Sequence, residues 1–381
     1  MSRREALRAE AVRQLRICDA CRYCEGYCAV FPALERRSPE IEGSVDYLAN
    51  LCHDCRACYY ACMYAPPHEF AVNIPRILQD ARLAGYDEFV SRRAPHRPLL
   101  RGQWVVPAAA LGLISLLVAT VSAASVGLGA FWRHGHGAAS PYQSLPYPAL
   151  LVLAGIPTLW GVAILARANV RYWRATGGLR GASVRPAALY RALRDAAVLA
   201  NLRGGGGECF YPDERPSPLR RRLHAAVAYG FVLCVASTVS AAVEQDLLGV
   251  QPPYGLFSVP VLLGLVGGVA LVVGCAGLIW LKLRSDPAPE SVAMAVRDYG
   301  LLFWLGLLSA SGLAVLGLRW STVAGAAFLV HLAVVLTAFV LAPYTKFAHV
   351  GYRVLALVQD AAERAGRRSA PAPAPGGGRP A

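Results

Sequence analysis

The chain has 381 residues, 55% of them hydrophobic, and its mean hydropathy is +0.39. This composition is too apolar for an ordinary soluble domain and indicates several membrane spans. The net charge of +14 comes without a nucleic-acid recognition motif or a basic strip interleaved with aromatic residues, so no nucleic-acid partner is expected. The N-terminal stretch MSRREALRAEAVRQLR lacks the apolar core of a signal peptide.

Residues 1–102 are polar and contain the pattern C-x-x-C-x-x-C-x-x-x-C twice. The two copies use eight of the eleven cysteines: Cys18, Cys21, Cys24 and Cys28, then Cys52, Cys55, Cys58 and Cys62. Such a triplet wraps one face of an iron–sulfur cube, and in two-cluster ferredoxins the fourth cysteine binds the other cluster. The sequence therefore predicts two [4Fe–4S] clusters. The first is assigned to Cys18, Cys21, Cys24 and Cys62, and the second to Cys52, Cys55, Cys58 and Cys28.

Zinc and disulfide bonds are the alternatives for these cysteines. Zinc sites usually use paired C-x-x-C knuckles rather than triplets with a fourth cysteine. A disulfide framework needs an oxidising compartment, whereas the charge pattern described below places this segment in the cytoplasm. Neither run has proline directly after its last cysteine, as bacterial ferredoxins do, because Pro32 and Pro66 come four residues later.

Beyond Gln103, six apolar runs are long enough to cross a bilayer. They are predicted at about 104–131, 148–166, 223–243, 257–281, 299–318 and 322–345. The polar loop at 167–222 is too long for a plain connector, and we expect it to dock the cysteine segment or cover a cofactor.

The predicted fold class is all-α. A helical di-cluster ferredoxin-like domain at 1–102 is followed by a six-helix, cytochrome-b-like transmembrane bundle at 103–350. The last segment, 351–381, is a tail that is expected to be disordered from about residue 367 because it is rich in proline, alanine and glycine.

The basic residues predict the orientation. If both termini face the cytoplasm, 36 of the 38 lysines and arginines lie on that side, and only Arg133 and Arg319 lie on the other. This is a strong positive-inside signal. It predicts a multi-pass membrane protein whose cysteine segment, 167–222 loop and C-terminal tail are all cytoplasmic.

Two histidines are candidate ligands of a b-type haem, which helix bundles hold between imidazoles on facing helices. His224 starts the third span and His349 ends the sixth, so both are expected at similar depth near the cytoplasmic face. Neutral imidazole is a suitable axial ligand of iron. The alternative is that both are interfacial histidines, solvated among basic side chains.

His331 lies in the apolar stretch AAFLVHLAVVLTAFV, 18 residues before His349. On one continuous helix this is five turns, which places both residues on one face about 27 Å apart. His331 is a candidate for a second haem or for a quinone contact, or it is a buried histidine bonded to a neighbouring helix. A second haem needs another ligand, for which only His134 and His136 in a loop-like segment are available, so one haem is favoured over two.

Four segments carry a resemblance to a known family: CDACRYCEGYCAVFPALERR, LCHDCRACYYACMYAPPHEFAVNIP, GGGGECFYPDERPSPLRRRLHAAVAYGFVLCVAST and HLAVVLTAFVLAPYTKFAHVGYR. Many ferredoxins share the cysteine motifs, but the combination with PPHEF, ECFYPDE and PYTKFAH is far more specific. Over nearly its whole length apart from the tail, the chain resembles the tricarballylate (citrate) utilization protein B family.

The resemblance implies an electron-transfer subunit of the bacterial inner membrane. In this family a separate flavin-dependent dehydrogenase oxidises tricarballylate to cis-aconitate. The B protein re-oxidises that flavin through two [4Fe–4S] clusters and haem b, and passes the electrons to the quinone pool. No G-x-G-x-x-G fingerprint follows a predicted strand here, so no bound flavin is expected. The substrate chemistry then belongs to the partner, and no catalytic residue is assigned to this chain.

Two other functions stay open. In some relatives a flavoprotein is fused ahead of the B-like part and is associated with an oxidative step in cobalamin ring synthesis, so the chain is alternatively a redox partner in that pathway. The other possibility is a membrane redox sensor, which would need an output domain.

Overall fold

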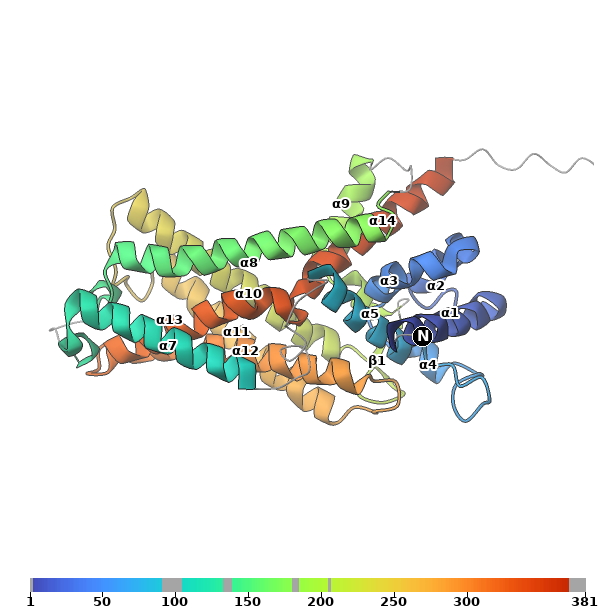
Figure 1. Cartoon of the computed structure of the whole chain (residues 1–381), viewed down its shortest axis with the longest axis horizontal. Helices are drawn as coiled ribbons and strands as arrows, with labels where there is room; N and C mark the ends of the chain where they lie inside the picture. Colours follow the sequence, from blue (N-terminus) through green and yellow to red (C-terminus); the bar gives the residue numbers. More distant parts are fainter. Residues whose placement is uncertain (1–2, 91–104, 133–138, 180–184, 205–206, 370–381) are drawn as a thin grey trace, which may run out of the picture.

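The structure is a computed structural model that describes residues 3–90, 105–132, 139–179, 185–204 and 207–369. The molecule is elongated, with a bundle of long helices at one end and a group of shorter helices at the other (Figure 1). Within the described residues, the strands form one short antiparallel pair, β1 (Cys209–Phe210) and β2 (Pro216–Ser217). The predicted all-α class, with a helical cysteine segment followed by a six-helix bundle, is confirmed.

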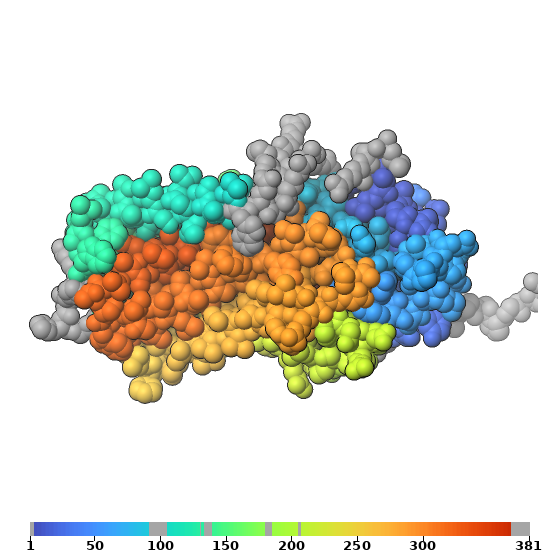
Figure 2. All heavy atoms as spheres, turned by 90° about the horizontal axis from the view of Figure 1, so that it is seen from below, coloured from blue at the N-terminus to red at the C-terminus, as the bar shows by residue number. Residues whose placement is uncertain are grey.

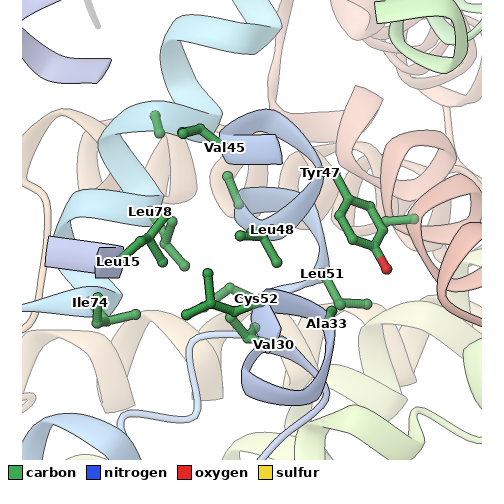
Figure 3. Packing of buried hydrophobic residues seen from close by; sticks show 14 of the residues in the cluster. Leu15, Val30, Ala33, Val45, Tyr47, Leu48, Leu51, Cys52, Ile74 and Leu78 are labelled. Atoms are coloured by element: carbon green, nitrogen blue, oxygen red, sulfur yellow. The ribbon is translucent and has the colours of Figure 1, made fainter. Parts of the chain in front are cut away.

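Residues 3–90 form a helical unit that we call the cysteine domain. Its elements are α1 (Arg3–Cys21), α2 (Val30–Arg36), η1 (Ser38–Glu40), α3 (Ile41–Leu51), α4 (Ala57–Tyr60) and α5 (Ile74–Val90). Buried positions on α3 recur at Ile41, Val45 and Leu48, which is the spacing of one helical face. That face packs on Leu15 of α1 and Leu78 of α5 (Figure 3). Cys52 lies in the same core, so packing holds the first residue of the second cysteine run in place.

Six helices of the described residues are long and apolar enough to cross a membrane. They are α7 (Val105–Val126), α8 (Tyr147–Ala175), α10 (Leu219–Asp246), α11 (Val259–Leu283), α12 (Val292–Gly317) and α13 (Ala324–Leu341). The first ends before its predicted boundary because Gly127 takes a left-handed φ of 82°, and η2 (Leu128–Trp132) follows. The second continues past its apolar run to Ala175, so helix covers part of the predicted loop; η3 (Pro141–Gln143) precedes it.

Helices α10 and α11 approach closely through glycine. A Cβ atom on Gly267 would lie 2.8 Å from the backbone oxygen of Gly230, and one on Gly230 would lie 2.9 Å from that of Gly267. Small residues allow such contacts between membrane helices. This contact fixes the position of α10, the helix that carries His224.

The prediction that His331 and His349 lie on one face of a continuous helix is wrong. α13 ends at Leu341 and is followed by η5 (Ala342–Tyr344), η6 (Lys346–Ala348) and α14 (His349–Ser369). Pro343 lacks a backbone N–H group and ends the helical ladder. Thr345 is extended (φ −105°, ψ 179°), and its side chain accepts a hydrogen bond from the backbone N–H of Phe347. His349 therefore starts a new helix.

Helix α14 joins the two ends of the molecule. Its Ala356 and Leu357 belong to the core of the cysteine domain, beside α9 (Pro186–Ala197). Arg36 pairs with Asp360, and Gln359 donates to the hydroxyl of Thr176 at 2.8 Å. Disorder was predicted from about residue 367, whereas α14 continues to Ser369, and the rest of the predicted tail lies outside the described residues.

The segment between α9 and α10 also reaches the cysteine domain. It contains η4 (Ala200–Arg203) and the β1–β2 pair, and Figure 2 shows it against the cysteine domain at the end of the bundle. The backbone N–H of Phe210 donates to the carbonyl of Cys55 at 2.9 Å. As expected for the 167–222 loop, part of it therefore docks on the cysteine domain, at the second cysteine run.

Candidate functional site

Two adjoining cavities in the cysteine domain are lined by the predicted cluster ligands. The first cavity is bordered by Cys18, Cys21, Cys24 and Cys62, and the second by Cys28, Cys52 and Cys55. Cys58 borders both, as do Phe31 and Ile74, so a thin wall separates the cavities. The fourth cysteine of each run thus lies beside the triplet of the other run.

The backbone turns sharply where each cysteine run begins. α1 ends at Cys21 and α3 ends one residue before Cys52. Arg22, Asp54 and Arg56 then take left-handed φ angles of 56°, 55° and 64°. Such residues cost on the order of 1–3 kcal/mol each and persist only where their surroundings hold them. These turns let successive thiols face one centre.

Burial and neighbouring thiols shift the pKa of several of these cysteines, and for most of the shifted thiols the pKa is raised. Burial raises the pKa of Cys18 to about 12, and the neighbouring Cys62 adds to the shift. A hydrogen bond to Cys55 raises the pKa of Cys28, and the same bond lowers the pKa of Cys55 to about 7. Bound iron would relieve this repulsion, because a coordinating thiol is deprotonated outright. The donor set therefore fits a cluster.

No three His, Cys, Asp or Glu side chains of the described residues converge as the ligands of a single ion would. An iron–sulfur cube differs from a single-ion site because each cysteine binds a different iron of the cluster. Its cysteines are consequently spread around the core, as the cysteines are around these two cavities.

Two arginines hold the second cysteine run by its backbone. Arg220, in the first turn of α10, donates to the carbonyls of His53 (3.0 Å) and Asp54 (2.8 Å). Arg82 on α5 donates to the carbonyl of Cys52 at 2.6 Å. Sequence analysis missed both roles and counted Arg220 only as a topology charge. The signal was its position four residues before His224, on the same helical face.

His224 and His349 lie near each other where α10 meets α14. Nδ1 of His349 is bonded to the carbonyl of Lys346, which leaves Nε2 as the free acceptor. Burial, with the cations Arg353 and Lys346 nearby, lowers the pKa of His349 well below its usual value, so the ring is neutral. The buried Nδ1 of His224 has no hydrogen-bond partner among the described residues. Two neutral, incompletely bonded imidazoles fit the axial ligands of a b-type haem.

Arg353 lies one turn further along α14, between the histidine pair and the second cavity. Burial lowers its pKa to about 10, and the cations Arg82 and Arg220 contribute, while Cys52 acts in the opposite direction. Among the described residues, no carboxylate pairs with this guanidinium. A buried cation without a counter-ion fits an anionic group such as a haem propionate.

His331 lies apart from the other histidines, at the opposite end of the bundle. It borders a cavity of about 510 Å³ between α10, α11, α12 and α13, which we call the outer cavity. Its Nδ1 lies 2.9 Å from the hydroxyl of Ser311. The other predicted ligands of a second haem, His134 and His136, lie outside the described residues.

Comparison with known proteins gives a consistent result. Residues 136–370 match the family described as Citrate utilization protein B, and residues 11–88 match the Citrate utilization protein B Fer4-like domain. The chain is 38% identical over 357 residues to Citrate utilization protein B of Escherichia coli, which covers 93% of this chain and 92% of that protein. No solved structure matches the chain. The chain therefore belongs to the citrate utilization protein B family, with a Fer4-like domain at its N-terminus.

Proposed function

We propose that this protein is a membrane electron-transfer subunit in citrate or tricarballylate utilization. It re-oxidises a separate flavin-dependent dehydrogenase, similar to tricarballylate dehydrogenase, and delivers the electrons to quinone. Family membership and the Fer4-like domain support this function. The observation that carries it is the continuity of the site: Arg220 contacts the second cysteine run one helical turn before His224.

In this proposal Cys18, Cys21, Cys24 and Cys62 hold one [4Fe–4S] cluster, and Cys28, Cys52, Cys55 and Cys58 hold the other. His224 and His349 hold one haem b. When bound, these groups supply one-electron carriers between a two-electron flavin and a two-electron quinone. The chain's own residues orient the carriers and exclude water, since Cys52 and Cys55 are 8% and 6% exposed.

The flavoprotein is expected to dock at the first cavity. Cys21 is exposed there, and the lining residues Tyr23 and Met63 are 58% and 61% exposed. Beside the second cavity, Asn201 forms part of the lining, and Phe210 and Arg220 bond to the backbone of the second cysteine run. The charge distribution supports a cytoplasmic position for this surface, in the inner membrane of a bacterium.

The cofactor content tests the proposal directly. Purified anaerobically in detergent, the protein should contain about nine irons per chain, eight in two cubes and one in haem, and about eight acid-labile sulfides. The reduced-minus-oxidised optical spectrum should show one b-type haem. Zinc without sulfide would contradict the cluster assignment, and clusters without haem would contradict the role of the histidines.

Substitutions can distinguish the proposed haem ligands from a histidine that lies nearby but is not expected to bind haem. His224→Ala and His349→Ala should each abolish the haem band and leave iron and sulfide at two-cluster levels. His53→Gln is the control, because Nδ1 of His53 is already bonded to the carbonyl of Leu51 at 2.7 Å and the residue borders the second cavity. Loss of haem in His53→Gln but not in His349→Ala would reassign the ligand.

Cys58→Ser tests the relay. The variant should lose one cluster and stop electron transfer from the flavoprotein to quinone, while dye-linked activity of the flavoprotein persists. Cys275→Ser, a change of a buried membrane-helix cysteine that lines neither cysteine cavity nor the outer cavity, should leave the transfer intact. Unchanged quinone reduction in Cys58→Ser would contradict the relay.

A further inference from the structure

The outer cavity, of about 510 Å³, has no role in the site described above. It is lined by the middle of α10, the first turns of α11, the last turns of α12 and nearly the whole length of α13. Four lining glycines keep it open: Gly264, Gly268, Gly312 and Gly325. A Cβ atom on Gly312 would lie 3.1 Å from the His331 ring, so even one methyl group would crowd the imidazole.

The cavity reaches the face of the bundle that meets lipid. Two of its lining residues, Val235 and Leu265, are 47% and 40% exposed on membrane helices. Most other lining residues are apolar. A ligand of this cavity would therefore enter from the bilayer, and would be lipid-soluble and largely uncharged.

Most polar groups of the cavity wall already have partners. The hydroxyls of Ser237 and Ser309 donate to backbone carbonyls at 2.6 and 3.0 Å. Arg319 donates to a backbone carbonyl at 2.9 Å and stacks on Trp320, while its buried Nε has no hydrogen-bond partner among the described residues. Within the described part of the chain, His331 has one partner, the hydroxyl of Ser311, and its Nε2 edge is available to a ligand.

The Ser311 hydroxyl allows His331 to present either a donor or an acceptor. Its oxygen lies 3.0 Å from the carbonyl of Leu308 and 2.9 Å from Nδ1 of His331. When the hydroxyl donates to the carbonyl, it accepts from Nδ1–H, and Nε2 is an acceptor. When it donates to Nδ1, Nε2 carries a hydrogen and becomes a donor. A quinone oxygen needs a donor and a hydroquinone hydroxyl needs an acceptor. The two tautomers of His331 supply these two roles, and the Ser311 hydroxyl can pair with either tautomer.

The inner end of the cavity adjoins the proposed haem site. Phe231 borders the cavity, and its ring packs on that of Phe347 at a centroid distance of 5.4 Å. Phe347 lies two residues before His349, and Phe231 lies two helical turns beyond His224 on α10. One aromatic layer therefore separates the cavity from the histidine pair.

We propose that the outer cavity is the quinone site and that His331 binds the quinone oxygen. This inference rests on the proposed function for its source of electrons. The quinone gains two electrons, delivered singly from the flavoprotein by the protein's metal carriers, and two protons from water, and becomes the hydroquinone. A second haem fits less well, because the lining contains one imidazole and no second haem ligand from a histidine of the described residues.

The test is photolabelling of the full-length protein in detergent with a short-chain azidoquinone, followed by peptide mapping. Labelling needs no electron donor, so it reports on the cavity even if the proposed function fails. We expect the label on peptides from α10, α12 or α13. An excess of unlabelled quinone should suppress this labelling. Labelling confined to the cysteine-domain end of the bundle would overturn the assignment.

Two tryptophan variants on α13 give a matched comparison. Val335→Trp fills the cavity, because Val335 lines it one turn beyond His331. Val330→Trp adds the same bulk on the lipid-facing side, where Val330 is 60% exposed. Quinone affinity should fall about tenfold or more in the first variant and stay unchanged in the second. Equal affinities would overturn the proposal.

His331→Gln separates quinone from haem. In dithionite-reduced protein, re-oxidation of the carriers by quinone should slow about tenfold or more with an unchanged haem content, since one hydrogen bond to the ligand is altered. Two haems per chain in the natural protein and one in His331→Gln would instead assign the cavity to a haem. If no carriers are present at all, the proposed function fails, and the labelling result still decides the cavity.

Discussion

At the scale of single residues, buried arginines organise the site. Arg56 is fully buried next to Cys55, in a left-handed backbone conformation. It donates to the carbonyl of Asp286 at 3.1 Å, pairs with Glu290 at 3.4 Å and stacks on Tyr211 at 4.1 Å. These partners all belong to the membrane half, so Arg56 fastens the cysteine domain at its second cavity.

Arg56→Ala should loosen this docking by about 3 kcal/mol or more, because it leaves the carbonyl and part of the carboxylate charge buried without their partner. Hydrogen exchange should increase in the 284–291 loop and in α4. Arg76→Ala on the exposed face of α5 is the control and should change neither. Equal protection from hydrogen exchange in the two variants would show that Arg56 does not hold the cysteine domain against the membrane half.

Arg220 has a second, electrostatic consequence. A buried cation beside a cluster stabilises the reduced, more negative form, so its removal should lower the reduction potential. Arg220→Gln should lower the potential of the second cluster by about 40 mV or more, which corresponds to about 1 kcal/mol at a protein-like dielectric. Arg222→Gln removes the same charge from an exposed position. An EPR-monitored redox titration of both variants checks the difference.

At the scale of elements, the glycine contact between α10 and α11 sets the position of His224. The atoms facing Gly267 are two backbone atoms of α10 and the Cβ atom of Leu233, and none of them can rotate away. A clash with a flexible side chain could be relieved by rotation of that side chain. A clash at Gly267 can be relieved only if one of the two helices moves. Gly230 and Gly267, which have no side chains, therefore set the position of the helix that carries a predicted haem ligand.

Gly267→Val should force α10 and α11 apart, destabilise the protein by about 1–3 kcal/mol and weaken haem retention. Gly112→Val is matched in chemistry and lies in α7 with nothing within 4 Å of its Cβ position. Thermal unfolding followed by haem absorbance should separate the two variants. A stable, haem-replete Gly267→Val would mean that the helices tolerate a wider spacing.

At the scale of the whole molecule, metal and packing support different parts of the cysteine domain. The helices share a continuous apolar core that includes α14, and the cysteine turns reach this core chiefly through the cysteines themselves. Oxidative removal of the clusters should therefore increase hydrogen exchange in the turns at 22–29 and 52–65. α3, α5 and the membrane helices should stay protected. Global loss of protection would show that the clusters hold the whole domain together.

Much of the architecture could be predicted from the sequence because its causes are local. Long apolar runs mark the six membrane helices, and the cysteine spacing marks the Fer4-like domain. The break before His349 was missed because hydropathy alone does not register the missing N–H of Pro343. The role of Arg220 was missed because its carbonyl partners lie more than 160 residues away in the chain. A charge count records the cation but not its partners.

Under the proposed function, the separation between the cysteine cavities and the outer cavity would link the protein to the energy state of the cell. Between these two places an electron would move along the bilayer normal, and a charge that crosses the full membrane changes in energy by about 2.3 kcal/mol per 100 mV. With the cysteine domain in the cytoplasm, an inside-negative potential drives electrons outward. In liposomes with an imposed potassium gradient, quinone reduction should accelerate as the potential grows. The same potential would then oppose the return of electrons from hydroquinone, so an energised membrane would make oxidation of the organic acid effectively one-way.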